Sequence, residues 1–236
     1  LLTLLLAGSG VSQDVQNVKA LGAVGDGVAD DTHAFERAFQ LANATPGTTV
    51  LVPAGLFLVR PFNLTSHTTL RLAANASVAA VADERAWPLI APAPGYGRGR
   101  DHPGPRYTSL LHGEHLVNVT VVGAGRSSVL DGRGVYWWDR VHELTYTRGH
   151  LLEFMYSRDV RVYDVHMRDS PYWFNHFYDC DGVHVRGVSI YAKDNSPNTD
   201  GWDPDSSRDV LIEDSTYVGG DDCVAIKAGW DCFGVD

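Results

Sequence analysis

The sequence has few cysteines, fewer basic than acidic residues, and no long hydrophobic run. Its 3 cysteines among 236 residues are too few for a disulfide scaffold, and their spacing fits no zinc motif. The 19 Lys and Arg against 29 Asp and Glu give a formal net charge of −10. Because nucleic-acid-binding domains normally present a basic face, we expect no nucleic-acid partner. No apolar run approaches the ~20 residues of a membrane-spanning helix, so we expect no membrane insertion.

The remaining composition, 44% hydrophobic and 20% charged, is typical of one soluble domain. The apolar run Leu1–Ala7 resembles the hydrophobic part of a signal peptide, with a buried strand as the alternative. We therefore expect residues 1–12 to be a signal-peptide remnant and residues 14–236 to be one domain, truncated at its C-terminus. We also expect a monomer. Secretion as a glycoprotein agrees with four Asn-X-Ser/Thr sequons, at Asn43, Asn63, Asn75 and Asn118.

The first part of the domain contains one helical pattern. The i, i+3, i+4, i+7 spacing of a short amphipathic helix is found in four apolar residues, Phe35, Ala38, Phe39 and Ala42. Asp30 and Asp31 precede them, where acidic residues cap a helix, and a metal site is the alternative for these two acids. We expect the helix to cover the N-terminal end of the sheet structure that follows.

From residue 116 onward, a turn residue followed by alternating β-branched residues recurs along the chain. The pattern begins each of four segments, Asn118–Val121, Asp159–Val162, Gly182–Val185 and Asp209–Ile212. The first valines of successive segments are 41, 23 and 27 residues apart, so the first interval corresponds to two repeats. A period in the twenties built of short strands indicates a solenoid. Because the leucine ladder of leucine-rich repeats is absent, we predict an all-β parallel β-helix with a short N-terminal capping helix.

Residues 83–107 are rich in proline and glycine and predict a long loop. The loop carries Arg98, Arg100 and Arg106 together with several aromatic residues. Two interpretations stay open, a cleft wall that supplies cationic contacts to an acidic substrate and a solvated surface excursion. The aromatic residues of the later run 172–178 are expected to fill the solenoid core rather than stack on sugar rings.

Three aspartates form the candidate chemical site. Asp200 precedes Asp221 and Asp222 by 21 and 22 residues, which is about one coil of the predicted solenoid. Because adjacent strands of a parallel sheet lie about 4.8 Å apart, Asp200 should lie one strand from the other two acids. Such a group of carboxyls suits glycoside hydrolysis, in which one carboxyl donates a proton and another activates water.

Two other interpretations of the three aspartates stay open. Asp favours turns, so the acids can serve only to shape corners of the chain. Clustered carboxylate oxygens also suit Ca²⁺, which would indicate a lyase or a structural ion. For a hydrolase we expect neither a metal nor another cofactor.

Several segments that span nearly all of residues 14–236 resemble glycoside hydrolase family 28, the polygalacturonases, and in particular its plant-type branch. These segments are Gly25–Thr32, Val52–Gly55, Tyr96–Asp101, Asp131–Gly134 with Trp137 and Trp138, Ser196–Asp203 and Gly220–Trp230. The first is shared by many β-helix proteins. The last two, in this order and one coil apart, are specific.

The resemblance implies a right-handed parallel β-helix that is secreted to the cell wall and hydrolyses α-1,4-galacturonosyl links of pectin with inversion. It implies that Asp221 is the general acid. Asp200 and Asp222 match the acids that position and deprotonate the attacking water, and Asn198 and Asp203 match residues that line the same site. The expected partner is therefore a pectic polysaccharide.

Some features of the family pattern are missing or ambiguous. Gly219 stands where Ser or Thr is common, which we interpret as neutral, and Lys227 is a candidate ligand for a galacturonate carboxylate, with burial of its stem as the alternative. The family's His-containing motif and Arg-x-Lys clamp are expected beyond Asp236, which leaves endo or exo action open. The alternative functions are a Ca²⁺-dependent pectate lyase and a non-catalytic polysaccharide-binding β-helix.

Overall fold

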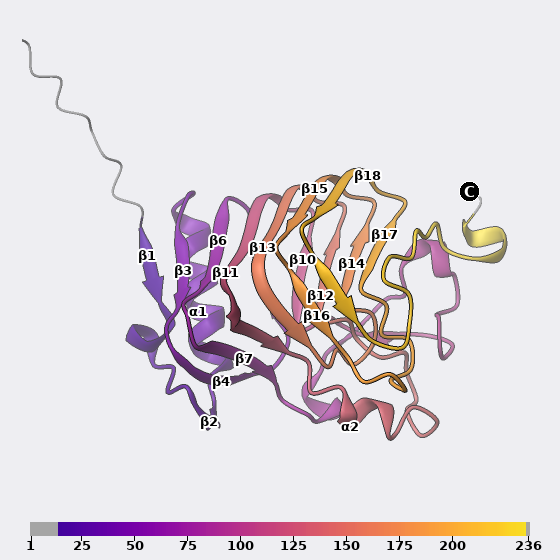
Figure 1. Ribbon diagram of the computed structural model, residues 1–236, viewed down its shortest axis with the longest axis horizontal. Helices are drawn as coiled ribbons and strands as arrows, with labels where there is room; N and C mark the ends of the chain where they lie inside the picture. The colour runs from indigo at the N-terminus through magenta and orange to yellow at the C-terminus, as the bar shows by residue number, and fades with distance from the viewer. Residues whose placement is uncertain (1–13, 235–236) are drawn as a thin grey trace, which may run out of the picture.

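The computed structural model describes residues 14–234, which coil into a three-sided solenoid of parallel strands (Figure 1). Each full coil adds one strand to each of three faces, so segments some twenty residues apart lie side by side. The predicted all-β, right-handed parallel β-helix is confirmed. The predicted signal-peptide remnant, residues 1–12, lies outside the described residues.

The strands of the three faces follow one another in chain order. The first face contains β1 (Val15–Asn17), β3 (Thr49–Val52), β6 (Thr68–Leu72), the first part of β11 (Val117–Asp131), the first part of β13 (Arg158–Arg168), β15 (Asp181–Arg186) and β18 (Arg208–Glu213). The second face contains β2 (Asp26–Asp30), β4 (Gly55–Val59), β7 (Ala76–Ala80), the remainders of β11 and β13, β16 (Ser189–Tyr191) and β19 (Thr216–Val218). The third face contains β5 (Phe62–Asn63), β10 (Leu111–Glu114), β12 (Leu152–Met155), β14 (Asn175–Tyr178) and β17 (Trp202–Asp205).

The turn residues of the sequence repeat form a stacked corner of the solenoid. All of them have positive φ: Asn118 56°, Asp159 55°, Gly182 76° and Asp209 53°. Among L-residues, Asn and Asp tolerate this left-handed conformation best, and glycine adopts it without steric cost. The sequence therefore places at each repeat a residue that can turn the chain sharply from the third face to the first.

The valines that follow these corners form the core. Val119, Val160 and Val183 are fully or almost fully buried, and they are paired in register on adjacent strands. Burying each such side chain stabilises the fold by roughly 1.5–3 kcal/mol, before the entropy cost of ordering the chain. The sequence repeat therefore has the length of one coil, because each coil must place an inward valine against the valine of the coil before it.

The predicted capping helix is α1 (Thr32–Ala44), which covers the N-terminal end of the stack (Figure 1). Its apolar face is buried, and Phe35 packs edge-on against Phe57 of β4. Asp31 occupies the N-cap position, but its carboxylate accepts from the backbone N–H groups of Val24 and Gly25 rather than from the helix. Asp30 instead accepts from the backbone N–H of Thr32, so both acids are explained without a metal.

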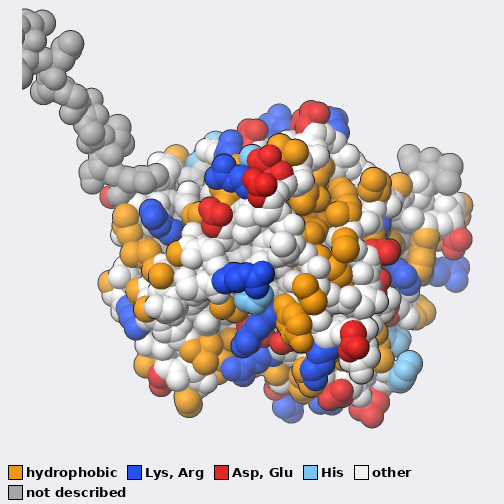
Figure 2. Space-filling view, viewed as in Figure 1, with side chains coloured by type: hydrophobic (Ala, Val, Ile, Leu, Met, Phe, Trp, Pro, Cys, Tyr) orange, Lys and Arg blue, Asp and Glu red, His pale blue; other side chains and the backbone are white. Residues whose placement is uncertain are grey.

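The opposite end of the stack leaves core positions exposed. Val210 and Ile212 continue the inward rows but are only partly buried, and Ile226 is 87% exposed. With Val224 and Pro204 they line an open groove of about 590 Å³. Figure 2 shows hydrophobic side chains gathered over this end, near β18.

Shorter elements connect or cover the faces. They are η1 (Val18–Leu21), η2 (Glu84–Ala86), η3 (Pro94–Tyr96), η4 (Asp231–Gly234), α2 (Val135–Trp138) and the antiparallel pair β8 (Leu89–Ile90) and β9 (Arg106–Tyr107). The first strand ends at Asn17, because η1 follows β1 directly. Among residues 14–234, no helix combines the length and apolar character needed to cross a membrane.

Candidate active site

The three candidate acids lie together at the exposed end of the third face. Asp200 stands just before β17, and Asp222 lies one coil later, where the backbone N–H of Gly201 donates to its carbonyl at 2.9 Å. One carboxylate oxygen from each of Asp200, Asp221 and Asp222 lies within 4.8 Å of the others. The sequence interval of about one coil therefore does bring these three acids, called here the acid cluster, to one place.

Tyr217 fixes the two segments that carry the acid cluster. Its hydroxyl donates to the carbonyl of Thr199 at 3.0 Å and accepts from the backbone N–H of Asp221 at 3.2 Å. A Cβ added at Gly219 would collide with the same hydroxyl. A larger residue at this position would therefore require the Tyr217 ring to move, and the interpretation of Gly219 as neutral stays a prediction.

The acids differ in exposure and in their charge partners. Asp200 is buried, Asp221 is half-buried and Asp222 is exposed. The ammonium of Lys227 lies 3.0 Å from Asp200 Oδ2 and 3.0 Å from Asp203 Oδ1. One cation thus faces an acid cluster of three carboxyls, together with the carboxyl of Asp203 beneath them.

Lys227 and Asp203 form the buried floor of the site. Burial raises the pKa of Asp203 well above its ordinary value, and the nearby charge of Asp200 adds to this. Burial opposes the charge of Lys227, but Asp203 and Asp200 outweigh it and raise the pKa of the ammonium. The Lys227 ammonium lies 4.2 Å from the centre of the Trp173 ring. Its direct partners are therefore two aspartates and an aromatic face.

Asn198 is held by an arginine that sequence reasoning did not single out. Arg148 is 1% exposed, and its guanidinium donates to Asn198 Oδ1 at 2.8 Å and to the carbonyl of Pro197 at 2.8 Å. It also pairs with Asp101 of the long loop at 3.2 Å. Arg148 thereby ties the loop to the segment that leads into Asp200. No local motif around Arg148 indicates this role.

A second set of polar and charged side chains, called here the buried network, lies on the outer side of the same third face. Arg106 pairs with Glu153 at 2.9 Å, and His176 bridges Glu153 Oε1 at 2.8 Å and Asp205 Oδ2 at 3.1 Å. The hydroxyl of Tyr96 donates to Asp205 Oδ2 at 2.6 Å. All five side chains are buried. Each charge has a partner of opposite sign, as charged groups require when they leave water.

The pairing within the buried network shifts its titrations. Burial opposes the charge of His176, but hydrogen bonds to Asp205 and Glu153 outweigh it and raise the pKa of the imidazole to about 9. Burial also opposes the charge of Glu153, but Arg106 and the adjacent histidines lower the pKa of this carboxyl well below its usual value. His176 is therefore protonated and Glu153 ionised near neutral pH.

Among residues 14–234, two groups of side chains have the spacing of metal ligands, the acid cluster and the trio His150, Glu153 and His176. In the trio, Arg106 binds both oxygens of Glu153 at 3.0 and 2.9 Å, so a second cation would meet a guanidinium. In the acid cluster, the ammonium of Lys227 already pairs with Asp200. The acid cluster remains the group with oxygen atoms left to bind a hard cation.

A periodic signal for the buried network is present in the sequence. Glu153, His176 and Asp203 occupy equivalent outward positions of adjacent strands, 23 and 27 residues apart. The inward valines Val160, Val183 and Val210 have the same two intervals. These polar residues recur at the same intervals as the core valines but on the opposite side of the strands. That recurrence in the sequence could therefore have revealed that they stack in one row on the outside of the solenoid.

The long loop 83–107 packs over the outer side of the third face. Tyr96 and Arg106 are buried there, so the interpretation as a solvated excursion was wrong. The five aromatic residues of the run 172–178 are all buried: Tyr172, Trp173, Phe174, Phe177 and Tyr178. The prediction that they fill the solenoid core holds for two of them, Phe174 and Phe177, whereas the other three pack with Tyr96 beneath the loop. The loop thus creates a second, smaller core outside the solenoid.

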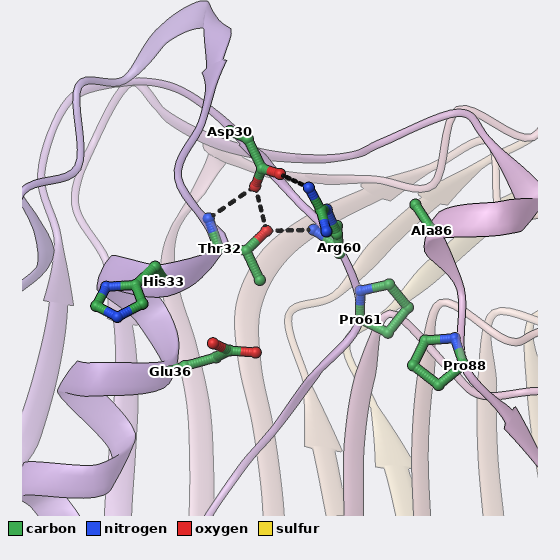
Figure 3. Close-up of a pocket in the computed structure, with 8 residues that line it drawn as sticks. All are labelled: Asp30, Thr32, His33, Glu36, Arg60, Pro61, Ala86 and Pro88. Carbon is green, nitrogen blue, oxygen red and sulfur yellow. Dashed lines mark hydrogen bonds and ion pairs between the residues drawn. The ribbon is translucent and has the colours of Figure 1, made fainter.

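A separate pocket of about 390 Å³ lies between α1 and the start of the long loop (Figure 3). Asp30 pairs there with Arg60 at 2.6 Å, and the backbone N–H of Arg60 donates to Thr32 Oγ1 at 2.8 Å. Figure 3 also shows His33 and Glu36 extending from the helix beside this ion pair. Asp30 is already paired with Arg60 and accepts from Thr32, and none of the predicted catalytic or substrate-binding residues lines this pocket.

Comparison with known proteins agrees with this geometry. The model of glycosyl hydrolases family 28 matches residues 44–233. A “Probable polygalacturonase” of Vitis vinifera is 43% identical over 219 residues, which cover 91% of this chain and 44% of that protein. A “Probable polygalacturonase” of Arabidopsis thaliana is 31% identical over 220 residues, which cover 92% of this chain and 44% of that protein. The chain therefore spans less than half the length of these curated relatives.

The solved structure of an exopolygalacturonase from Thermotoga maritima is similar, with a TM-score of 0.80 and 27% identity. The match covers 94% of this chain and 56% of that one. The family match, the two relatives and this structural likeness confirm the resemblance that the sequence segments indicated. The chain belongs to family 28 of the glycosyl hydrolases.

Proposed function

We propose that this protein hydrolyses α-1,4-galacturonosyl links in pectin, acting as a secreted enzyme of the plant cell wall. The observation that carries the proposal is the acid cluster, three carboxyls within 4.8 Å of one another at the rim of the third face. Like charges this close cost stability, and such costly groupings are concentrated at functional sites, where the chemistry uses them. The printed names of the two plant relatives and of the Thermotoga structure support pectic substrates.

We assign the roles within the acid cluster from the family resemblance and the observed exposure. Asp221 is the general acid, and its half-buried position suits a carboxyl that donates to a departing glycosidic oxygen. Asp200 and Asp222 position and deprotonate water. Asp200 is held by the Lys227 ammonium, which fixes the direction of its carboxylate. Asn198 and Asp203 line the same site.

The stereochemical outcome needs its own test. Carboxyl separations of roughly 6.5–9.5 Å are typical of inverting glycosidases, and about 5–5.5 Å of retaining ones. The closest oxygens of the acid cluster are nearer than either range. Inversion therefore rests on the family resemblance. The anomeric configuration of the first product, followed by proton NMR, decides between the two outcomes.

The activity is tested by incubating the purified protein with polygalacturonate and measuring reducing ends. Hydrolysis predicts reducing ends without new absorbance near 230 nm, and no loss of rate with a chelator. The acid cluster also has the spacing of Ca²⁺ ligands, which favours a pectate lyase as the second candidate. Unsaturated, ultraviolet-absorbing products and full chelator sensitivity would establish the lyase instead. Binding of polygalacturonate without turnover would establish a non-catalytic module.

A further inference from the structure

The tip of the long loop and the segment 228–234 are joined by hydrogen bonds and an aromatic contact. The backbone N–H of Trp230 donates to the carbonyl of Gly95 at 2.9 Å, and its indole N–H donates to the carbonyl of Tyr96 at 3.2 Å. The rings of Tyr96 and Trp230 lie edge to face, 6.0 Å apart. Two segments more than 130 positions apart therefore form one continuous wall.

Arg100 extends from this wall. Its guanidinium carbon lies 4.9 Å from the centre of the Trp230 ring, and the side chain is partly exposed. Arg100 lines a small cavity together with Tyr172 and Trp173. The Lys227 ammonium, which pairs with Asp200, lies on the ring of that same Trp173. The side chains of Trp173 and Lys227 therefore link Arg100 to Asp200 of the acid cluster.

The backbone on both sides of Arg100 is fixed. On one side, Tyr96 is anchored through its hydroxyl to Asp205. On the other, the backbone N–H of Asp101 donates to Thr147 Oγ1 at 3.0 Å, and its carboxylate pairs with Arg148. A side chain held between two such anchors loses little further entropy when it binds a ligand.

Arg100 is also a cation without an internal counter-charge. Lys227, Arg106 and Arg148 all have carboxylate partners within 4.0 Å. Within the part of the chain that the structure describes, Arg100 has no carboxylate at that distance. Its guanidinium is packed on the Trp230 ring instead. A guanidinium packed on an aromatic face keeps its edge N–H groups available for bidentate binding of a carboxylate.

We infer that Arg100, held by Trp230, binds a carboxylate of a polyuronate chain next to the acid cluster and so selects acidic over esterified sugar units. This inference rests on the proposed function, which it makes more specific. A chain with a net charge of −10 repels a polyanion in general, and the acid cluster adds to that repulsion. The Arg100 guanidinium, which has no carboxylate partner among the described residues, offsets this repulsion locally. Its contact with one substrate carboxylate also fixes how the sugar chain is aligned along the site.

The test compares Arg100→Gln with Arg98→Gln in the intact protein. Arg98 is exposed on the same loop, lines no cavity with Trp173 and has no aromatic partner among the described residues, so its variant removes the same charge at a different place. Kinetics are measured on polygalacturonate and on highly methyl-esterified pectin. Thermal unfolding of each variant confirms that the fold is retained.

For Arg100→Gln we expect KM on polygalacturonate to rise at least tenfold with kcat changed less than threefold, and KM on esterified pectin to stay within threefold. Arg98→Gln should match the wild type on both substrates. Arg100→Lys should recover part of the loss, and Trp230→Leu should behave like Arg100→Gln. Equal KM values for Arg100→Gln and wild type on polygalacturonate would overturn the inference. So would an equal rise on both substrates.

Failure of the proposed function gives a different result. If the wild-type protein releases no reducing ends from either substrate, the hydrolase proposal fails before the variants are compared. Direct binding of polygalacturonate by calorimetry then still tests Arg100. Weaker binding of Arg100→Gln than of Arg98→Gln supports the carboxylate contact, and equal binding excludes it.

Discussion

The outer side of the third face carries two groups of carboxylates that differ in almost every physical respect. In the buried network, Glu153 and Asp205 are fully buried, and each is neutralised by a cation. In the acid cluster, Asp221 is half-buried and Asp222 is exposed, and the nearby ammonium of Lys227 pairs with Asp200 rather than with either of them. Both groups occupy adjacent coils of the same face.

The difference indicates what each group does. A buried, fully paired set of charges fixes geometry, because any rearrangement leaves a charge without a partner in a low dielectric. Here it holds the long loop on the solenoid through Tyr96 and Arg106. A cluster with excess negative charge at an accessible rim is suited to proton transfer. Four variants and conditions separate these roles, in order of decreasing expected effect.

Asp221→Asn should show the largest effect on activity. Removing a general acid typically costs 10²–10⁴-fold, so we expect kcat on polygalacturonate to fall about 10³-fold. The free energy of unfolding should change by less than about 0.5 kcal/mol, because the residue is not fully buried. Asp209→Asn, an exposed corner residue in a conformation that Asn tolerates, is the control. Near-normal activity of Asp221→Asn would show that another group donates the proton.

Glu153→Gln should show the opposite profile, with its main effect on stability. The change leaves the charges of Arg106 and His176 buried with one fewer counter-ion, which typically costs about 3–5 kcal/mol. Urea unfolding measures this loss. Glu143→Gln, whose side chain is 75% exposed, should change the unfolding free energy by less than about 0.5 kcal/mol. Equal stability of the two variants would mean that the network does not hold the fold together.

The stability of the protein should fall at alkaline pH because of His176. Its folded pKa of about 9 lies above the ordinary value of 6.5, so protonation stabilises the folded state. This contribution is complete below about pH 6.5 and is lost as the pH rises through about 9. The loss should be roughly 3–4 kcal/mol, the difference between the two pKa values converted to free energy. Unfolding free energies of the wild type and of His176→Gln, measured between pH 6 and 10, should converge at the alkaline end. Parallel curves would contradict this assignment.

Lys227→Met should have the smallest effect of the four, about tenfold on kcat. Removing the ammonium disfavours the ionised form of the carboxyls beside it, so the acid limb of the pH–rate profile should move to higher pH. Lys193→Met, at an exposed position, is the control. If KM rises while kcat and the pH profile stay unchanged, Lys227 instead binds substrate, as the sequence first suggested.

The sequence by itself determined the framework of the fold and the meeting of the three acids. Corner residues such as Asp159 and inward residues such as Val160 recur with the coil period, and hydrogen bonding between parallel strands fixes the distance from one coil to the next. An interval of 22 residues therefore placed Asp222 beside Asp200 without knowledge of any other part of the chain. The capping helix was likewise evident from local periodicity.

Only the tertiary structure decided which charges are paired. Arg148 pairs with Asp101, and Tyr96 reaches Asp205 across more than 100 positions, because the long loop folds back over the third face. Loop paths depend on many weak contacts and have no periodic signature. Whether an outward carboxylate such as Glu153 becomes a buried ion pair or an exposed acid depends on what covers it. That covering layer comes from distant segments, so local sequence does not reveal it.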